Sequence, residues 1–166
     1  MLPLRRPGQL PLGSPTEELY ARIDMIVHKA LPIGSRMAVY ARAGASGSHS
    51  GTVDDQVKKV TAHASERGLQ VVATYTDVGG GSQVGPGLAE MIQAARGDNR
   101  AFSAVLADDA ERVGRSVKIV RAVIDSLSEV GVSLWTIGRS GEIKLLDAAA
   151  AGFVGPLREV GMRTSR

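Results

Sequence analysis

The rest of this chain is organised around MAVYARAG at residues 37–44. Its apolar, β-branched and aromatic residues predict a short buried strand, and the following residues, ASGSHSG over 45–51, form a loop of small residues. A helix is expected to begin near Thr52. Binding and catalytic groups often lie where a parallel strand runs into a loop, because the strand fixes their position and the loop admits the ligand.

The rest of the chain repeats this unit of a strand followed by a helix. Alternation of this kind implies parallel pairing through right-handed crossovers. The sequence therefore predicts an α/β fold, a three-layer sandwich with a mainly parallel sheet of about four to five strands. The expected elements after the first strand are a helix over 53–68, a strand over 69–76, a helix over 86–96, a strand over 102–107, a polar connector over 108–114, a helix over 115–130, a strand over 132–137, and a segment over 142–166 that starts as a helix.

Residues 1–34 are expected to form an N-terminal extension ahead of a main domain over 35–166. Within the extension, Ser14, Pro15 and Glu17 supply a helix start, and apolar residues recur at helical spacing from Leu19 to Ala30. An extra amphipathic helix is therefore expected at about 15–30. It would pack on its own domain, cover a sheet edge or mediate association.

The amino-acid composition limits the classes of function that the chain can have. The chain has 166 residues, enough for one domain with a core, and it has no cysteine and three histidines, which excludes disulfides and argues against a zinc site. Its formal net charge of +3 is compatible with binding to a polyanion but does not by itself indicate such binding. No apolar run is long enough for a membrane span or a signal peptide. We expect a cytoplasmic protein with no cofactor and no metal.

Arginines follow two of the expected strands: Arg42 after the first, and Arg112 and Arg115 after the third. The carboxyl ends of parallel strands meet at one edge of a sheet, so these guanidiniums could converge on a single anion such as a phosphodiester. The alternative is that each is a solvated surface group or an ion-pair partner. The glycines at 79–81 lack the frame of a phosphate-binding loop.

Several motifs together resemble the catalytic domain of the serine recombinases, the resolvase/invertase family. YARAG at 40–44 is similar to the family's Tyr-x-Arg-Val-Ser, and ERVGR at 111–115 to its Asp-Arg-Leu-Gly-Arg. The stretch from Asp77 to Leu88 resembles its Asp…Ser-Gly…Arg-Pro-Gly-Leu, VDDQ at 53–56 the start of its first helix, and 131–137 its last core strand. The resemblance covers residues 37–137 well and 138–166 loosely.

The resemblance implies a function. In the family, the serine of the first motif attacks a DNA phosphodiester to form a 5′-phosphoserine, arginines hold the scissile phosphate, and dimers or tetramers exchange strands. Carried over, Arg42, Arg112 and Arg115 become catalytic and DNA-binding phosphate ligands. Tyr40 and Gln56 become their supporting residues. Arg158 corresponds to a DNA-binding arginine of the late helix.

Departures from the family pattern are equally informative. The nucleophile position is Gly44, which has no side chain with which to attack, so covalent catalysis should be lost. Gly85 replaces the arginine before Pro-Gly-Leu, and Glu111 replaces an aspartate. Leu157 stands where the family has a glutamate, and Ser82 is displaced from the second loop's Ser-Gly.

Two hydroxyls lie near the vacant nucleophile position, Ser46 and Ser48, in the small-residue loop. A substitute nucleophile would need in-line geometry that such a loop does not supply, so both are better interpreted as groups that satisfy local backbone. Glycines and a proline over 152–156 are expected to truncate the last helix, and no C-terminal DNA-binding domain is expected.

Three hypotheses remain open. The first is a recombinase-like protein that keeps a weak, non-specific DNA-phosphate face but does not cleave, acting as a homo-oligomer or with an active recombinase. The second is an active recombinase or nickase that uses Ser46 or Ser48. The third is a protein-interaction module that acts through the helix at 15–30.

Overall fold

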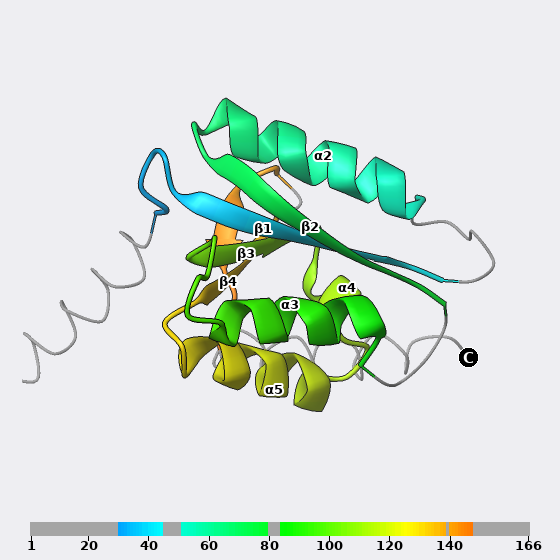
Figure 1. Ribbon diagram of the computed structural model, residues 1–166. Helices are drawn as coiled ribbons and strands as arrows, with labels where there is room; N and C mark the ends of the chain where they lie inside the picture. The colour runs from blue at the N-terminus through cyan, green and yellow to red at the C-terminus, as the bar shows by residue number, and fades with distance from the viewer. Residues whose placement is uncertain (1–29, 45–50, 80–83, 139, 148–166) are drawn as a thin grey trace, which may run out of the picture. The chain divides into compact units, whose positions relative to one another are not determined.

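The computed structural model describes residues 30–44, 51–79, 84–138 and 140–147. These residues form a five-stranded sheet in the order β2-β1-β3-β4-β5, with helices on both faces (Figure 1). The α/β sandwich with a mainly parallel sheet is thereby confirmed. Its elements are β1 Arg36–Ala43, α2 Val53–Glu66, β2 Gln70–Val78, α3 Pro86–Arg96, β3 Ala104–Ala107, α4 Ala110–Val113, α5 Val117–Ser128, β4 Ser133–Ile137 and β5 Ile143–Leu145.

Strand β1 is the centre of the sheet's pairing. It pairs in parallel with β2 from Arg36↔Gln70 to Ala43↔Val78, and with β3 only from Met37↔Ala104 to Tyr40↔Ala107. β4 continues the parallel ladder beside β3, and β5 pairs antiparallel with β4. The last three residues of β1 therefore extend beyond the end of β3.

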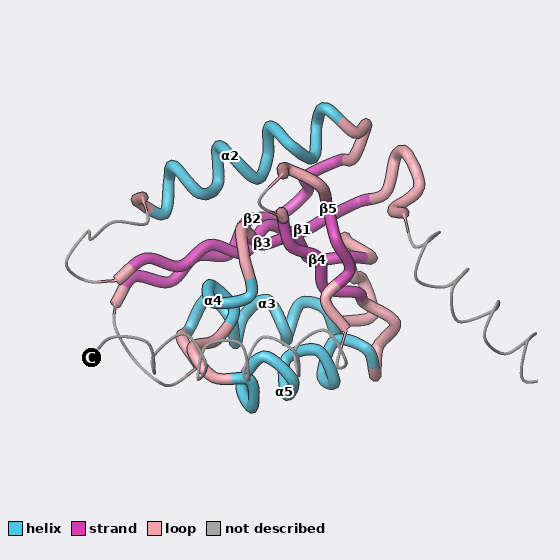
Figure 2. The backbone as a smooth tube through the Cα atoms, turned by 180° about the vertical axis from the view of Figure 1, so that it is seen from behind, coloured by secondary structure: helices cyan, strands magenta, loops and turns pink. Residues whose placement is uncertain are grey.

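Alternation along β1 divides the core into two layers. Met37 and Val39 face α2 and pack with Val60 and Trp135, whereas Ala38 and Tyr40 face the opposite layer of α3, α4 and α5. Figure 2 shows this division, with α2 alone on one side of the strands. By the same alternation, Arg42 falls on the face that carries α3, α4 and α5.

Local signals explain where the helices begin. Thr52 caps α2 through a capping box with Asp55, in which the Thr52 hydroxyl accepts from the Asp55 amide at 3.1 Å. Pro86 occupies the first turn of α3, and Ser116 caps α5 by accepting from the Ile119 amide at 3.3 Å. Among the residues that the structure describes, every helix is too short or too polar to cross a bilayer.

Three sequence expectations need correction. The segment from residue 142 does not start as a helix: Ile143–Leu145 is strand β5, because these residues pair antiparallel with β4 and that pairing overrides their local preference. The connector over 108–114 contains a short helix, α4, which Asp109 caps. Arg42 lies within β1 and not after it. The proposed helix at 15–30 lies, apart from its last residue, outside the described residues.

Candidate functional site

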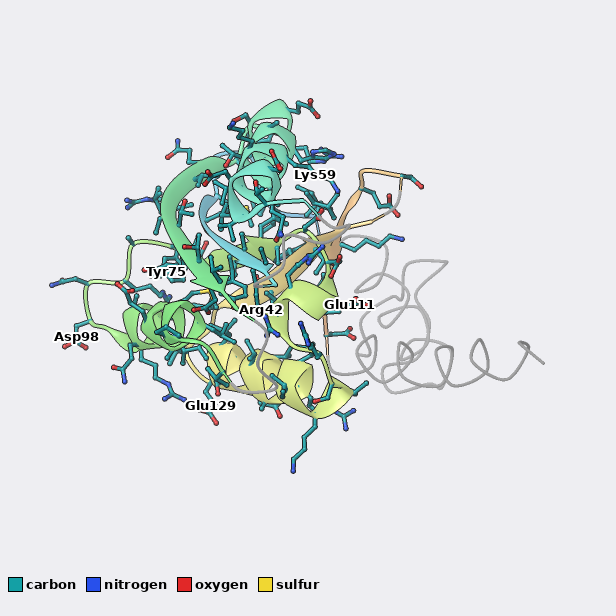
Figure 3. All side chains as sticks on the ribbon, turned by 90° about the vertical axis from the view of Figure 1, so that its right-hand side faces the viewer. Arg42, Lys59, Tyr75, Asp98, Glu111 and Glu129 are labelled. Atoms are coloured by element: carbon teal, nitrogen blue, oxygen red, sulfur yellow. The ribbon has the colours of Figure 1, made fainter. Side chains whose placement is uncertain are left out.

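The carboxyl ends of β1 and β3 form a topological switch point. The chain leaves β1 toward α2 on one face of the sheet and leaves β3 toward α4 and α5 on the other. Loops that depart in opposite directions leave a crevice between them, which is where open α/β sheets usually bind ligands. Figure 3 looks onto the carboxyl ends of these strands, with Arg42 near the centre of the view.

Gln56 holds the end of β1 where β3 no longer pairs with it. The Arg42 amide donates to Gln56 Oε1 at 3.2 Å, and Gln56 Nε2 donates to the Arg42 carbonyl at 2.9 Å. The side-chain amide thus supplies the donor and the acceptor that a neighbouring strand would otherwise supply. Gln56 is 2% exposed, so these bonds are shielded from water. Gln56 therefore fixes the backbone of Arg42 at the end of β1.

Arg112 meets the same peptide group from α4. Its Nη1 donates to the Arg42 carbonyl at 3.4 Å, and its Nε lies 3.8 Å from Asp109 Oδ2. Asp109 Oδ1 also accepts from the amides of Glu111 and Arg112 at 2.8 and 3.2 Å. A four-residue helix has too few internal bonds to be stable alone, so Asp109 is needed to fix α4. The structure thus places the Arg112 guanidinium against the Arg42 backbone.

Arg115 is exposed in the turn between α4 and α5. The turn is tight, because a Cβ on Gly114 would lie 2.6 Å from the Ile119 side chain. Arg115 therefore lies in a fixed turn three residues after Arg112. Its convergence with Arg42 and Arg112 stays a prediction.

Tyr40 and Asp77 form a buried pair near the carboxyl ends of β1 and β2. The Tyr40 hydroxyl donates to Asp77 Oδ2 at 2.9 Å, and the Asp77 carboxylate also accepts from the Gly87 and Leu88 amides at 2.8 and 2.9 Å. Burial, and secondly the bond to Asp77, raise the pKa of Tyr40 well above its usual value, while the nearby charge of Arg42 opposes this shift. Tyr40 is therefore a neutral donor that ties β1 to the first turn of α3.

Asp77 was not among the predicted site residues. It lies 37 positions from Tyr40, so no local spacing connects the two, although the resemblance had placed Asp77 at the family's aspartate. A carboxylate at a helix N-terminus is stabilised by the free amides there and by the helix dipole. Asp77 joins β1, β2 and α3 at one point.

The two glycines that depart from the family pattern have opposite surroundings. Among the described residues, a Cβ on Gly44 would meet nothing within 4 Å, whereas a Cβ on Gly85 would lie 2.4 Å from the Asp77 carboxyl group. A side chain at Gly85 would therefore displace Asp77 from the amides of α3. The nucleophile position has room for a side chain that it lacks, and position 85 does not.

A separate pocket of about 720 Å³ lies between α2, α4 and the residues that follow β4. It is lined by Lys59, His63, Asp108 and Glu111 together with the turn between β4 and β5. Lys59 Nζ lies 2.6 Å from Asp108 Oδ1, and His63 Nδ1 lies 3.0 Å from the Lys59 carbonyl. Within the described part of the chain, no cluster of acidic or histidine side chains could hold a metal ion. Ser46, Ser48 and Arg158 lie outside the described residues.

Comparisons with known proteins agree with this geometry. A family model described as Resolvase, N terminal domain, matches residues 37–154. The N-terminal catalytic domain of TP901-1 integrase superposes with a TM-score of 0.58 at 23% identity, covering 76% of this chain and 94% of that one. A resolvase family site-specific recombinase from Streptococcus pneumoniae gives 0.57 at 17% identity, covering 78% and 91%.

The C-terminal catalytic domain of ISC1926 TnpA, an IS607-like serine recombinase, gives a TM-score of 0.54 at 20% identity, covering 75% of this chain and 79% of that one. At these identities the likeness shows a shared fold. No curated protein sequence matches the chain.

The fold defines an α/β domain with a topological switch point at the carboxyl ends of β1 and β3. The family match, which covers more than half of the sequence, makes the identification specific. The chain belongs to the Resolvase, N terminal domain family.

Proposed function

We propose that this chain is a serine-recombinase-like protein that binds the DNA backbone through Arg42, Arg112 and Arg115 and does not cleave it. The observation that carries the proposal is the packing of the Arg112 guanidinium on the Arg42 carbonyl, two residues before Gly44. Two arginines are thus held at the end of β1, beside a position with no nucleophilic group.

The chemistry of the arginines suits a phosphodiester. A guanidinium presents several N–H donors in a planar fork that matches phosphate oxygens, and it keeps its charge at any physiological pH. Gln56 and Asp109 hold the backbone and the helix from which two of these groups project. A site so fixed would bind phosphate without reading the base sequence.

With glycine at position 44, the proposed site would bind a phosphodiester without cleaving it. Cleavage in this family implies a serine at that position, and glycine supplies no oxygen to form a phosphoserine. The protein would therefore act in the cytoplasm as an accessory subunit, in a homo-oligomer or together with an active recombinase. An active enzyme using Ser46 or Ser48, and an interaction module acting through the helix at 15–30, are the alternatives.

Salt-dependent DNA binding tests the proposal. Fluorescence anisotropy with a duplex of arbitrary sequence should show weak binding whose log–log salt slope falls in magnitude by roughly 1 in Arg115→Ala, and again in Arg112→Ala. Arg115 is exposed, so its removal should leave the fold intact.

Arg96→Ala is the matched control. It removes the same charge from the far end of α3, where Arg96 Nη2 lies 3.6 Å from Glu129. Equal losses in Arg96→Ala and Arg115→Ala would show general attraction to a basic protein and would overturn the site. An unchanged affinity in both Arg112→Ala and Arg115→Ala would overturn it as well.

A further inference from the structure

Side chains take the place of the sheet ladder between the carboxyl ends of β1 and β3. The ladder joins these two strands only as far as Tyr40↔Ala107. Asp108, the residue after β3, stays tied to β4, because its carbonyl accepts from the Ile137 amide at 3.2 Å. The position of Asp108 relative to the end of β1 therefore depends on contacts outside this ladder.

Helix α2 contacts both strand ends from one of its faces. Gln56 and Lys59 are three residues apart, so they project from the same side of the helix. Gln56 bonds to the Arg42 peptide at the end of β1. Lys59 Nζ lies 2.6 Å from Asp108 Oδ1. A single helix thus holds the end of β1 and the residue that follows β3.

The contact at Asp108 lies next to the cap of α4. Asp108 directly precedes Asp109, whose carboxylate accepts from the Glu111 and Arg112 amides at the start of that helix. The Asp108 side chain is 14% exposed, whereas that of Lys59 is 51% exposed. A largely buried carboxylate is unfavourable without a partner. Loss of Lys59 would therefore favour movement of Asp108 toward water, and the adjoining cap would move with it.

We propose that Lys59 is a positioning residue for Arg112. Its ion pair with Asp108 holds the start of α4 at a fixed distance from the end of β1. At that distance, the Arg112 guanidinium reaches the Arg42 carbonyl. The inference rests on the proposed function, because it gives Lys59 a part in the phosphate site without a contact to DNA. Gln56 fixes the Arg42 side of the site, and Lys59 fixes the Arg112 side.

Amide hydrogen exchange, measured by NMR on the full chain without DNA, tests the hold on α4. The Arg112 and Gly114 amides donate to the Asp109 and Ala110 carbonyls, each at 3.2 Å. Lys59→Met should speed their exchange by roughly threefold, the effect expected from losing a partly exposed ion pair. Asp108→Asn should do the same, because it weakens the same contact although it changes the net charge in the opposite direction.

DNA binding then tests whether Lys59 acts through Arg112. In fluorescence anisotropy at low salt, Lys59→Met should weaken binding by roughly threefold, and Lys59→Arg should bind like the parent. Lys58→Met is the matched control, since it removes the same charge from the exposed neighbouring position. It should leave the exchange rates unchanged and weaken binding less. In the Arg112→Ala background, Lys59→Met should weaken binding no more than Lys58→Met does.

Two outcomes would overturn the inference. Exchange at the parent's rate in both Lys59→Met and Asp108→Asn would show that the ion pair does not hold α4. A threefold loss of affinity that persists in the Arg112→Ala background would show that Lys59 contacts DNA itself. Failure of the proposed function gives a different result: faster exchange in Lys59→Met, with a DNA affinity that Arg112→Ala and Arg115→Ala leave unchanged. That result would uphold the hold on α4 and overturn the phosphate site.

Discussion

Gln56→Ala tests the idea that a side chain takes the place of a strand at the end of β1. The substitution removes two hydrogen bonds, of 2.9 and 3.2 Å, to the Arg42 peptide. It also leaves the buried Arg42 amide without that acceptor, whereas the carbonyl keeps the longer bond from Arg112. A typical buried hydrogen bond contributes about 1 kcal/mol, and an unsatisfied buried donor costs about 1–3 kcal/mol. The free energy of unfolding should therefore fall by roughly 2–4 kcal/mol.

Urea denaturation at neutral pH measures this loss as a shift in the transition midpoint. Gln93→Ala is the matched control, since Gln93 is exposed on α3 and its loss should change stability by less than about 0.5 kcal/mol. Gln56→Glu should also destabilise, because it keeps the acceptor for Arg42 but loses the donor. A loss in Gln56→Ala no larger than in Gln93→Ala would refute the role given to Gln56.

Further predictions concern the Asp77 cluster. The free energy of unfolding should decline as pH rises above about 10, the usual tyrosine pKa, because the raised pKa of Tyr40 keeps its proton on in the folded chain while the unfolded chain loses it. Tyr40→Phe should flatten this decline in urea titrations at alkaline pH. An identical decline in the variant would contradict the pairing of Tyr40 with Asp77. Asp77→Asn should cost about 1–3 kcal/mol, because an amide cannot accept from all three donors that meet the carboxylate, and an unchanged urea midpoint would refute this. Gly85→Ala should destabilise by about 1–3 kcal/mol through its clash with Asp77, whereas Gly44→Ala should be nearly neutral; thermal melts that rank these two variants the other way would refute the geometry.

Local chemistry explains what the sequence predicted well. The starts of α2 and α3 follow from Thr52 and Pro86, residues whose effect on a helix end depends only on their immediate neighbours. The alternation of strands with helices predicted a parallel sheet, because parallel strands need a crossover connection, usually a helix. The family resemblance covered the region that the family model matches.

Contacts between distant residues explain what was missed. Nothing near Gln56 in the sequence shows that it bonds to the Arg42 peptide, and nothing near Asp77 shows that Tyr40 reaches it. The sequence predicts a helix from residue 142, yet pairing with β4 makes Ile143–Leu145 a strand. Tertiary pairing overrides local preference at such positions.

The most direct test of the account restores the missing nucleophile. Parent and Gly44→Ser proteins are incubated with supercoiled and nicked DNA, and covalent protein–DNA adducts are sought under denaturing conditions. The open space around Gly44 admits the serine side chain. The account predicts an adduct with Gly44→Ser and none with the parent, and Arg42→Ala in the Gly44→Ser protein should abolish it. An adduct with the parent would contradict the loss of cleavage and direct attention to Ser46 and Ser48, and no adduct with either protein would contradict the retained arginine site.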